Sequence, residues 1–397
     1  MTLYRDYPSH RSCRYRDTWA EVSLDAIAHN VRLFKNNLKQ AARFMAVVKA
    51  DGYGHGAAEA AFMALEAGAD YLGVAFVDEA VQLRHAGVQA PILILGCTPP
   101  HAVEAAIRQR LTITVSSRDM LDDVTRCAKT IGLQAIVHLK IDTGMSRLGF
   151  APEEALSVCL ASASPLVAIE GIFTHFADAD NSDPAFTREQ YGAFVSLLER
   201  LSESGVHIPI KHCCNSAAAM KFPDMHMDMV RIGIAMYGLT PLPGEPHPAY
   251  PLREAMQLKT NISYVKPVHK NKPVSYGLTY RTDKDSLVAT LPIGYADGLS
   301  RRLSNNGFAL VRGRRVPIIG RVCMDQTMID VTSFPGLKAG EEATLFGASE
   351  GDRISIHEIA ARMGTIPYEV VCLIGKRVPR EYVRHGELVA ATNLLLE

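Results

Sequence analysis

Short apolar runs recur along the first part of the chain and alternate with segments of helical periodicity. In the segment 119–131, for example, Leu121, Val124 and Ala128 would share one face of a helix, as apolar residues three or four positions apart do. The apolar runs, each of a length typical of a buried strand, cover residues 44–48, 71–76, 91–95, 111–115, 135–141, 167–174, 208–213 and 229–237. Eight strands that alternate with helices predict an α/β fold, the (β/α)8 TIM barrel.

The pattern changes near residue 241, where the proline-rich stretch 241–251 is typical of a linker. Beyond it the apolar segments are short and separated by glycine and charged residues, and one helix is expected at 355–363. The strand candidates there cover 258–268, 287–293, 308–311, 316–322, 328–331 and 343–346. We therefore expect an N-terminal extension at 1–16, a barrel domain at 17–242 and a mainly β domain at 243–397.

Composition narrows the class of protein. Of the 397 residues, 48% are hydrophobic and 21% are charged, with 42 basic and 42 acidic residues, so no excess of positive charge favours nucleic acid as a partner. No run approaches the ~18 apolar residues of a membrane span, and the charged N-terminus is unlike a secretory signal. The eight cysteines lack metal-site or redox spacing, which predicts no metal site and a cytoplasmic protein with reduced thiols.

A lysine marks the first predicted strand end. Lys49 follows the apolar run 44–48 and precedes a glycine-rich turn, 50–56. An amine at the rim of a barrel core is partly desolvated, which favours its nucleophilic neutral form, and glycines let the backbone approach a ligand closely. The alternative interpretation is a surface lysine beside a tight turn.

Other polar residues also follow predicted strands, at the end of the barrel where enzymes of this fold build their sites. These residues are Tyr53, Lys140, Asp142, Arg147, Thr174, His175, Asn215, Ser216, Arg231, Gly233 and Ile234. The loops after the last two strands usually bind phosphate, which suits Ser216 and Gly233. A phosphate together with an aldehyde that a lysine can attack predicts pyridoxal 5'-phosphate as the cofactor.

Ordinary structural roles are the alternatives for three of these residues. His175 could be a hydrogen-bonded core histidine, Arg147 could pair with Asp142, and Asn215 could fix a turn. Arg231 is different, because a guanidinium inside an apolar strand requires a partner.

Several sequence blocks resemble those of bacterial alanine racemases. The block 48–56, Val-Lys-Ala-Asp-Gly-Tyr-Gly-His-Gly, is similar to the cofactor-lysine signature of that family. Further similar blocks follow in order across both domains, at 140–149, 171–176, 231–238, 274–277, 291–298, 320–326 and 377–380. The resemblance covers nearly the whole chain after the N-terminal extension, for which we find no counterpart.

The resemblance implies a homodimeric enzyme that interconverts L- and D-alanine and supplies D-alanine for peptidoglycan. Lys49 would hold pyridoxal phosphate as a Schiff base and act as the base on one face of the substrate Cα. Tyr276 of the partner subunit would act on the other face, because a single base mostly returns its own proton. His175 and Arg231 would connect Tyr276 to the cofactor, with Arg231 facing the pyridine nitrogen.

The resemblance also implies the remaining binding residues. Arg147 would contact the cofactor's phenolic oxygen and orient the substrate carboxylate, which would also meet Met324 beside Asp325. Tyr295 would narrow the entrance, and Lys140 matches a position that is carbamylated in many relatives. The other cofactor-binding positions, most of them around the phosphate, are Tyr53, Asn215, Ser216, Gly233, Ile234 and Tyr368.

Three rival functions remain open at this point. The pattern Gly52-x-Gly54-x-x-Ala57, with Asp78 further on, loosely fits an NAD-dependent dehydrogenase, although eight βα units exceed a six-stranded sheet. A decarboxylase or a broader serine/alanine racemase of the same fold is the second, and Arg231 opposes the decarboxylase. A non-catalytic pyridoxal phosphate carrier is the third, and the β domain opposes it.

Overall fold

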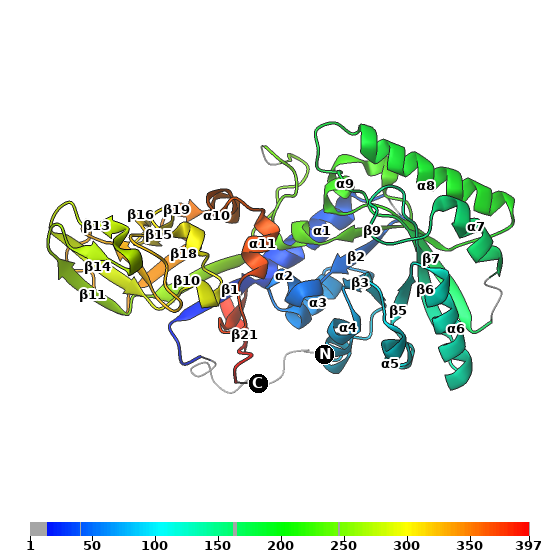
Figure 1. The fold of residues 1–397 in the computed structure, drawn as a ribbon, viewed down its shortest axis with the longest axis horizontal. Helices are drawn as coiled ribbons and strands as arrows, with labels where there is room; N and C mark the ends of the chain where they lie inside the picture. The colour runs from blue at the N-terminus through cyan, green and yellow to red at the C-terminus, as the bar shows by residue number, and fades with distance from the viewer. Residues whose placement is uncertain (1–13, 40, 162–164, 245–246, 397) are drawn as a thin grey trace. The chain divides into compact units, whose positions relative to one another are not determined.

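The computed structural model describes residues 14–39, 41–161, 165–244 and 247–396, so most of the expected extension 1–16 lies outside the described residues. The chain forms two compact units (Figure 1). One consists of Ala26–Gly52 and Ala57–Arg253; the other holds the described residues up to Asp25, the turn Tyr53–Gly56, and the chain from Glu254 onward. We call them the barrel unit and the β unit.

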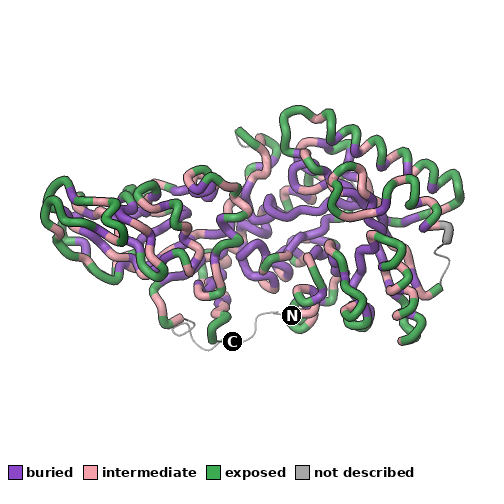
Figure 2. The backbone as a smooth tube through the Cα atoms, viewed as in Figure 1, coloured by how far each residue is buried: buried purple, intermediate pink, exposed green. Residues whose placement is uncertain are grey.

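The barrel unit is built on eight parallel strands in the order β8-β7-β6-β5-β4-β3-β2-β9. They are β2 (Arg43–Val47), β3 (Tyr71–Val74), β4 (Ile92–Ile94), β5 (Thr112–Val115), β6 (Ala135–Lys140), β7 (Val167–Phe173), β8 (Ile210–His212) and β9 (Met229–Ile232). The N–H groups of Asp228 and Arg231 donate to the carbonyls of Lys211 and Cys214, both at 3.0 Å, and these bonds close the barrel between β8 and β9. The strands are largely buried (Figure 2), and the predicted TIM barrel is confirmed.

Helices alternate with these strands. They are α1 (Leu24–Asn37), α3 (Ala57–Glu66), α4 (Val77–His85), α5 (Val103–Arg108), α6 (Arg118–Ile131), α7 (Pro152–Ala161), α8 (Ala185–Glu203) and α9 (Ser216–Lys221). α6 shows how sequence sets their bounds: the Ser117 hydroxyl accepts the N–H of Met120, and Gly132 ends the helix with φ 66°. Among the residues that the structure describes, no helix has both the length and the apolar composition of a membrane span.

The β unit contains one large sheet, one three-stranded sheet and one two-stranded sheet. The large sheet comprises β16 (Arg314–Pro317), β15 (Phe308–Val311), β18 (Glu342–Ser349), β10 (Met256–Asn261), β1 (Thr18–Ser23), β20 (Arg380–Arg384) and β21 (Glu387–Thr392), with β19 (Asp352–Ile354) beside β18. The smaller sheets are β11 (Tyr264–Val268), β14 (Ser286–Leu291) and β17 (Thr327–Asp330), and β12 (Pro273–Val274) with β13 (Tyr280–Arg281). Two helices, α10 (Ile356–Met363) and α11 (Pro367–Cys372), complete the unit.

The structure differs from the expected elements at several places. β1, which the expected boundary at residue 17 assigns to the barrel domain, pairs instead with β10 and β20 of the β unit. The expected strand 229–237 ends at Ile232, because Gly233 adopts φ −106° and ψ −100° and a 3-10 turn, Ile234–Tyr237, follows. The expected strand 258–268 divides into β10 and β11, which lie in different sheets, and α11 has no counterpart among the expected elements.

A glycine makes room for a histidine inside the barrel. Gly171 of β7 pairs with His138 of β6, and a Cβ at 171 would lie 2.6 Å from the imidazole Cε1 and Nδ1. We expect Gly171→Ala to lower the free energy of unfolding by about 1–3 kcal/mol through overpacking, as measured by urea denaturation. The control is Gly192→Ala on α8, where nothing lies within 4 Å of the added Cβ and up to about 1 kcal/mol of stabilisation is expected. Equal stabilities of the two variants would contradict this packing.

Candidate active site

The lysine at the end of β2 begins a left-handed turn, α2 (Lys49–Tyr53). Ala50, Asp51 and Tyr53 have φ of 52°, 52° and 53°, and each such residue with a Cβ costs about 1–2 kcal/mol. Strain of this kind persists only where the surroundings hold the backbone, and it concentrates at functional sites.

Two carboxylates in the barrel unit hold this turn. Glu79 of α4 accepts the N–H of Ala50 on one oxygen and that of Ala75 on the other, both at 2.7 Å. Asp51 accepts the N–H of Ala57 at 2.9 Å, which joins the turn to the start of α3. Nothing in the sequence singles out Glu79, because an acidic residue in the first turn of a helix is common. Asp78, the acid of the dehydrogenase alternative, is exposed on the same helix.

Arg231 of β9 is the buried cation of the site, with 4% of its surface exposed. Its Nη1 lies 3.0 Å from Nδ1 of His212, and its Nη2 lies 3.0 Å from Nδ1 of His175 and from the carbonyl oxygens of Thr174 and Cys213. Burial lowers the pKa of Arg231 to about 10, so the group stays charged at neutral pH. No carboxylate among the described residues forms an ion pair with it.

The Arg231 contact fixes the tautomer of His175. A guanidinium only donates hydrogen bonds, so Nδ1 of His175 accepts and the ring proton sits on Nε2. Burial, followed by the charges of Arg231, Lys140, Arg147 and Lys49, holds the pKa of His175 well below its usual value. His175 is therefore a neutral ring whose Nε2–H is a hydrogen-bond donor.

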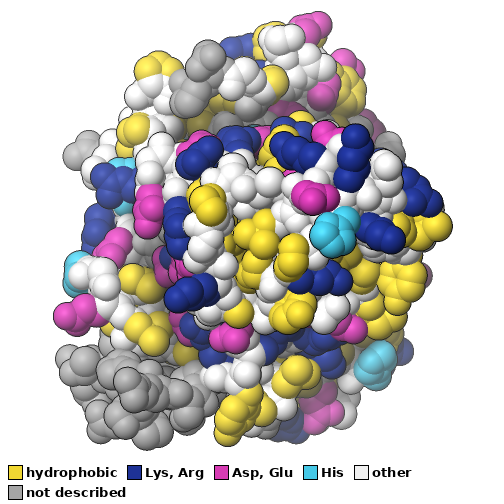
Figure 3. Space-filling view, turned by 90° about the vertical axis from the view of Figure 1, so that its left-hand side faces the viewer, with side chains coloured by type: hydrophobic (Ala, Val, Ile, Leu, Met, Phe, Trp, Pro, Cys, Tyr) yellow, Lys and Arg dark blue, Asp and Glu magenta, His cyan; other side chains and the backbone are white. Residues whose placement is uncertain are grey.

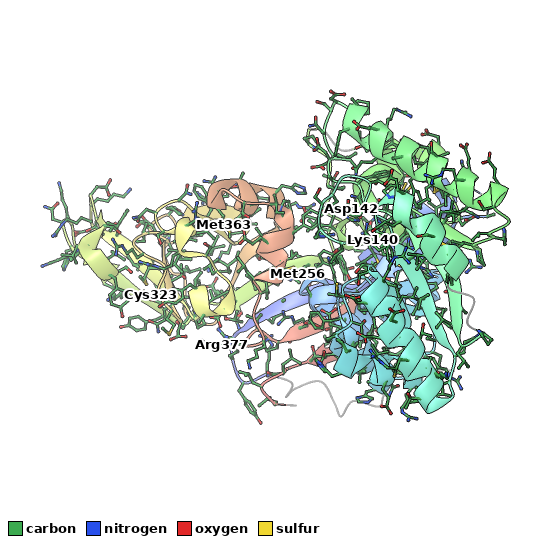
Figure 4. All side chains as sticks on the ribbon, turned by 45° about the vertical axis from the view of Figure 1, so that its right-hand side comes forward. Lys140, Asp142, Met256, Cys323, Met363 and Arg377 are labelled. Atoms are coloured by element: carbon green, nitrogen blue, oxygen red, sulfur yellow. The ribbon has the colours of Figure 1, made fainter. Side chains whose placement is uncertain are left out.

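Lys140 and Asp142 mark the end of β6 (Figure 4). The Lys140 ammonium donates to the Ile141 carbonyl at 2.8 Å, and only 5% of the residue is exposed. Burial, followed by the charge of Arg231, lowers the pKa of Lys140 to about 7. Asp142 accepts the backbone N–H groups of Gly144 and Ser146, at 3.0 and 3.1 Å, and so shapes the loop that carries the exposed Arg147.

The phosphate candidates lie where β8 and β9 end. Asn215 caps α9 by accepting the Ala218 N–H at 2.9 Å, which is the structural role considered above. The Ser216 hydroxyl accepts the N–H of Gly233 at 3.0 Å, leaving its own proton to donate. Ile234 is buried at the start of the following 3-10 turn.

The β unit brings three of the predicted residues together. Tyr276 lies on a strained loop, in which Ser275 and Leu278 have φ of 66° and 52°. The Ser275 hydroxyl donates to the Arg321 carbonyl at 2.6 Å, which ties this loop to the segment 320–326. The same segment also contacts the 3-10 turn at Tyr295, because the N–H of Tyr295 donates to the Cys323 carbonyl at 2.9 Å.

Backbone packs closely around Gly294, shortly after β14, and this packing explains why a glycine stands there. A Cβ at Gly294 would lie 2.3 Å from the Cys323 carbonyl oxygen and 2.4 Å from that of Met324. Tyr276, Tyr295 and Met324 remain exposed, at 72%, 41% and 52%, so these bound loops present aromatic and apolar side chains outward. Figure 3 shows a face on which hydrophobic side chains gather among Lys and Arg. Elsewhere in the β unit, the rings of Tyr53 and Tyr368 lie with centroids 6.2 Å apart.

A buried carboxylate anchors the Tyr295 turn. Asp297 is fully buried and receives Arg16 on both oxygens, at 2.7 and 3.0 Å, with Arg377 at 3.3 Å. Arg377 also donates to Asp325 at 2.7 Å (Figure 4 labels Arg377 and Cys323). Arg16, at the end of the expected extension, therefore has a structural role that the sequence did not indicate.

We expect Arg16→Met to lower the free energy of unfolding by about 2 kcal/mol, because the buried Asp297 carboxylate loses two charge-assisted hydrogen bonds and keeps the Arg377 contact and the Gly294 N–H at 3.1 Å. Denaturation in urea measures the loss. The control is Arg14→Met, whose partner Glu381 is partly exposed, and which should cost less than about 1 kcal/mol. A loss at Arg16 no larger than that at Arg14 would contradict the anchoring role.

Comparisons with known proteins agree across both units. Residues 22–241 match the family model described as alanine racemase, N-terminal domain, and residues 255–382 match that described as alanine racemase, C-terminal domain. Alanine racemase 2 of Oceanobacillus iheyensis is 52% identical over 378 residues, 94% of this chain and 95% of that protein. The alanine racemase of Desulfovibrio desulfuricans is 47% identical, over 93% of this chain and 98% of that protein.

Solved structures give the same answer. The alanine racemase of Bacillus anthracis with bound L-Ala-P is similar with a TM-score of 0.90 and 40% identity, covering 96% of this chain and 99% of that one. The alanine racemase of Clostridium difficile in complex with cycloserine also gives 0.90, at 39% identity, covering 96% of this chain and 100% of that one. The chain therefore belongs to the alanine racemase family of pyridoxal phosphate-dependent isomerases.

Proposed function

We propose that this protein interconverts L- and D-alanine with bound pyridoxal phosphate, using Lys49 and Tyr276 as its two bases. The observation that supports this most directly is the buried Arg231, which holds His175 as a neutral donor. Arg231 is a cation fixed at a strand end of a barrel, and no carboxylate in the described part of the chain forms an ion pair with it, which suits an acceptor atom of a cofactor or substrate. The Bacillus anthracis relative, crystallised with L-Ala-P, makes alanine the first substrate to test.

The residues of the barrel unit fit the cofactor. Lys49 offers an amine on a strained turn, and Ser216 offers a hydroxyl proton beside the Gly233 backbone, where this fold usually binds phosphate. We propose that Lys49 binds the aldehyde carbon and that Arg231 faces the pyridine nitrogen. Further phosphate contacts would come from Asn215 and Ile234, and we propose the same role for Tyr53 and Tyr368, which belong to the β unit. Bound there, pyridoxal phosphate supplies the electron sink that acidifies the Cα proton of an amino acid.

Two bases on opposite faces of Cα are required for racemisation. Lys49 serves one face, and Tyr276 of the partner subunit would serve the other. A phenol with a pKa near ~10 is a poor base at neutral pH unless a donor stabilises its anion. The Nε2–H of His175, held by Arg231, is a donor of the right kind.

The remaining predicted residues would bind the substrate. Arg147 and the Met324 backbone, beside Asp325, would bind its carboxylate, and Tyr295 would limit the pocket to a methyl side chain. A methyl-sized difference provides only ~1–3 kcal/mol of discrimination, so serine is the competitor to test. A broader serine/alanine racemase is therefore the second candidate.

We also propose a cytoplasmic homodimer that supplies D-alanine for peptidoglycan. The exposed Tyr276, Leu278 and Met324 form apolar surface of the kind that a second subunit covers. All cysteines within the described part of the chain are free thiols, as expected in a reducing compartment. Racemisation of L-alanine by the purified protein, coupled to a D-amino-acid assay with L-serine as the comparison, tests the activity itself; a protein that binds the cofactor but racemises neither would overturn it.

The two bases are separated by two substitutions. Lys49→Ala should abolish covalent attachment of the cofactor, so borohydride treatment should leave the mass of the chain unchanged. Tyr276→Phe should keep that attachment but slow exchange of the alanine Cα proton with D2O in one direction preferentially. Racemisation of both enantiomers by Tyr276→Phe at the wild-type rate would exclude the two-base assignment.

Mixing the same variants tests the shared site. In a hybrid dimer of Lys49→Ala with Tyr276→Phe, one of the two sites would hold both wild-type bases. Random pairing of equal amounts makes about half of the dimers hybrid, so about a quarter of all sites should be active. Subunits that each supply both bases to their own site would give no recovery.

Lys140 should carry a carbamate. With a pKa of about 7, much of its amine is neutral near pH 7 and can attack CO2, forming an N–C bond and releasing a proton. We expect protein supplied with 13C-labelled bicarbonate to show a carbamate carbonyl signal that grows as pH rises through 7 and fades below it. Lys140→Ala should lose this signal and the control Lys211→Ala should keep it; its persistence in Lys140→Ala would refute the assignment.

A further inference from the structure

Two buried histidines extend from Arg231 toward the other end of the barrel. His212 Nε2 lies 3.0 Å from His138 Nδ1, and His138 Nε2 lies 3.1 Å from Glu170 Oε2. Both histidines are fully buried, and the His212 ring stacks on Phe173 with centroids 4.7 Å apart and an interplanar angle of 6°. Strand positions facing the barrel interior thus carry a continuous line of polar groups through an apolar core.

The donors in this line can be assigned from Arg231 onward. Arg231 donates to Nδ1 of His212, so the proton of His212 sits on Nε2 and is donated to Nδ1 of His138. The proton of His138 then sits on its own Nε2 and is donated to the Glu170 carboxylate. Burial lowers the pKa of both rings, which keeps them neutral in this arrangement.

Glu170 ends the line at a cavity. Its side chain is 32% exposed and lines a space of about 380 Å³ at the amino ends of the strands, together with Tyr71 and Thr112. Tyr71 donates to the same carboxylate oxygen at 2.9 Å and lies 2.5 Å from the Thr112 hydroxyl. Glu170 is therefore the acid that hydrogen bonds reach from Arg231 through His212, and both His138 and Tyr71 hold its carboxylate. It lies at the opposite end of the barrel from Lys49.

We propose that Glu170 is the remote counter-charge of Arg231 and acts on it through His138 and His212 as a positioning residue. Its carboxylate polarises the two imidazoles in series, strengthens Nδ1 of His212 as an acceptor, and so holds the guanidinium in one orientation. The consequence for catalysis rests on the function proposed above; the arrangement of protons does not.

The test is Glu170→Gln, which removes the charge and keeps the shape. The control is Glu199→Gln on the exposed side of α8. The full chain is labelled with 15N-histidine, and the ring nitrogen resonances of His212 are assigned in NMR spectra by their loss in His212→Gln. These resonances should show the Nε2–H tautomer. They should shift in Glu170→Gln and not in Glu199→Gln.

Activity gives the second readout. A unit charge acting over the span of two imidazoles changes an equilibrium by about tenfold at protein-like dielectric constants. We expect kcat of Glu170→Gln to fall by up to about tenfold, with KM for alanine changed less than about twofold, and Glu170→Asp to recover part of it. Urea denaturation of each variant identifies loss of fold.

Unchanged His212 resonances in folded Glu170→Gln, or an Nδ1–H tautomer in the wild type, would overturn the proposal. The tautomers are measured without any catalytic turnover. An inactive protein with the expected resonances would therefore count against the racemase function and not against the link from Glu170 to Arg231 through the two histidines.

Discussion

The site depends on one buried cation that is surrounded by neutral acceptors. The Arg231 guanidinium binds two imidazoles and two backbone carbonyls, and each contact restricts what its partner can be. His175 and His212 must both accept at Nδ1 and carry their protons on Nε2. A single charge in the barrel core therefore sets the protonation of the groups on either side of it, one toward the carboxyl ends of the strands and one toward the amino ends.

Backbone strain provides the second constraint. The turn after Lys49 uses left-handed residues that carry side chains, and Glu79 and Asp51 supply the hydrogen bonds that hold it. The loop of Tyr276 is strained in the same way and is held by Ser275. Both proposed bases thus stand on backbone that the surrounding structure over-determines, which restricts their motion without requiring bulky side chains around them.

The barrel was predictable because periodicity reports burial directly, and eight apolar runs at regular spacing leave few other folds. Arg231 was also recognisable, since a cation in an apolar strand needs a partner. The carboxylates that hold the Lys49 and Tyr295 turns were not recognisable, because Glu79 and Asp297 look like ordinary surface acids until the tertiary structure shows which groups they bind. His138 and His212 at inward strand positions were a signal that could have been used. The place of β1 could not be read, because a short strand does not reveal which sheet it joins.

Positive charge accumulates at the carboxyl ends of the barrel strands, and this accumulation explains the pKa shifts as a set. Burial comes first for both His175 and Lys140, and Arg231 is the next cause that lowers each. The net effect is that burial and the charge of Arg231 suppress protonation of these two neighbours. Anions reverse this balance: a cofactor phosphate, a substrate carboxylate and a carbamate on Lys140 would each be attracted by the same field. The same positive charge that suppresses protonation of His175 and Lys140 would therefore select anionic ligands.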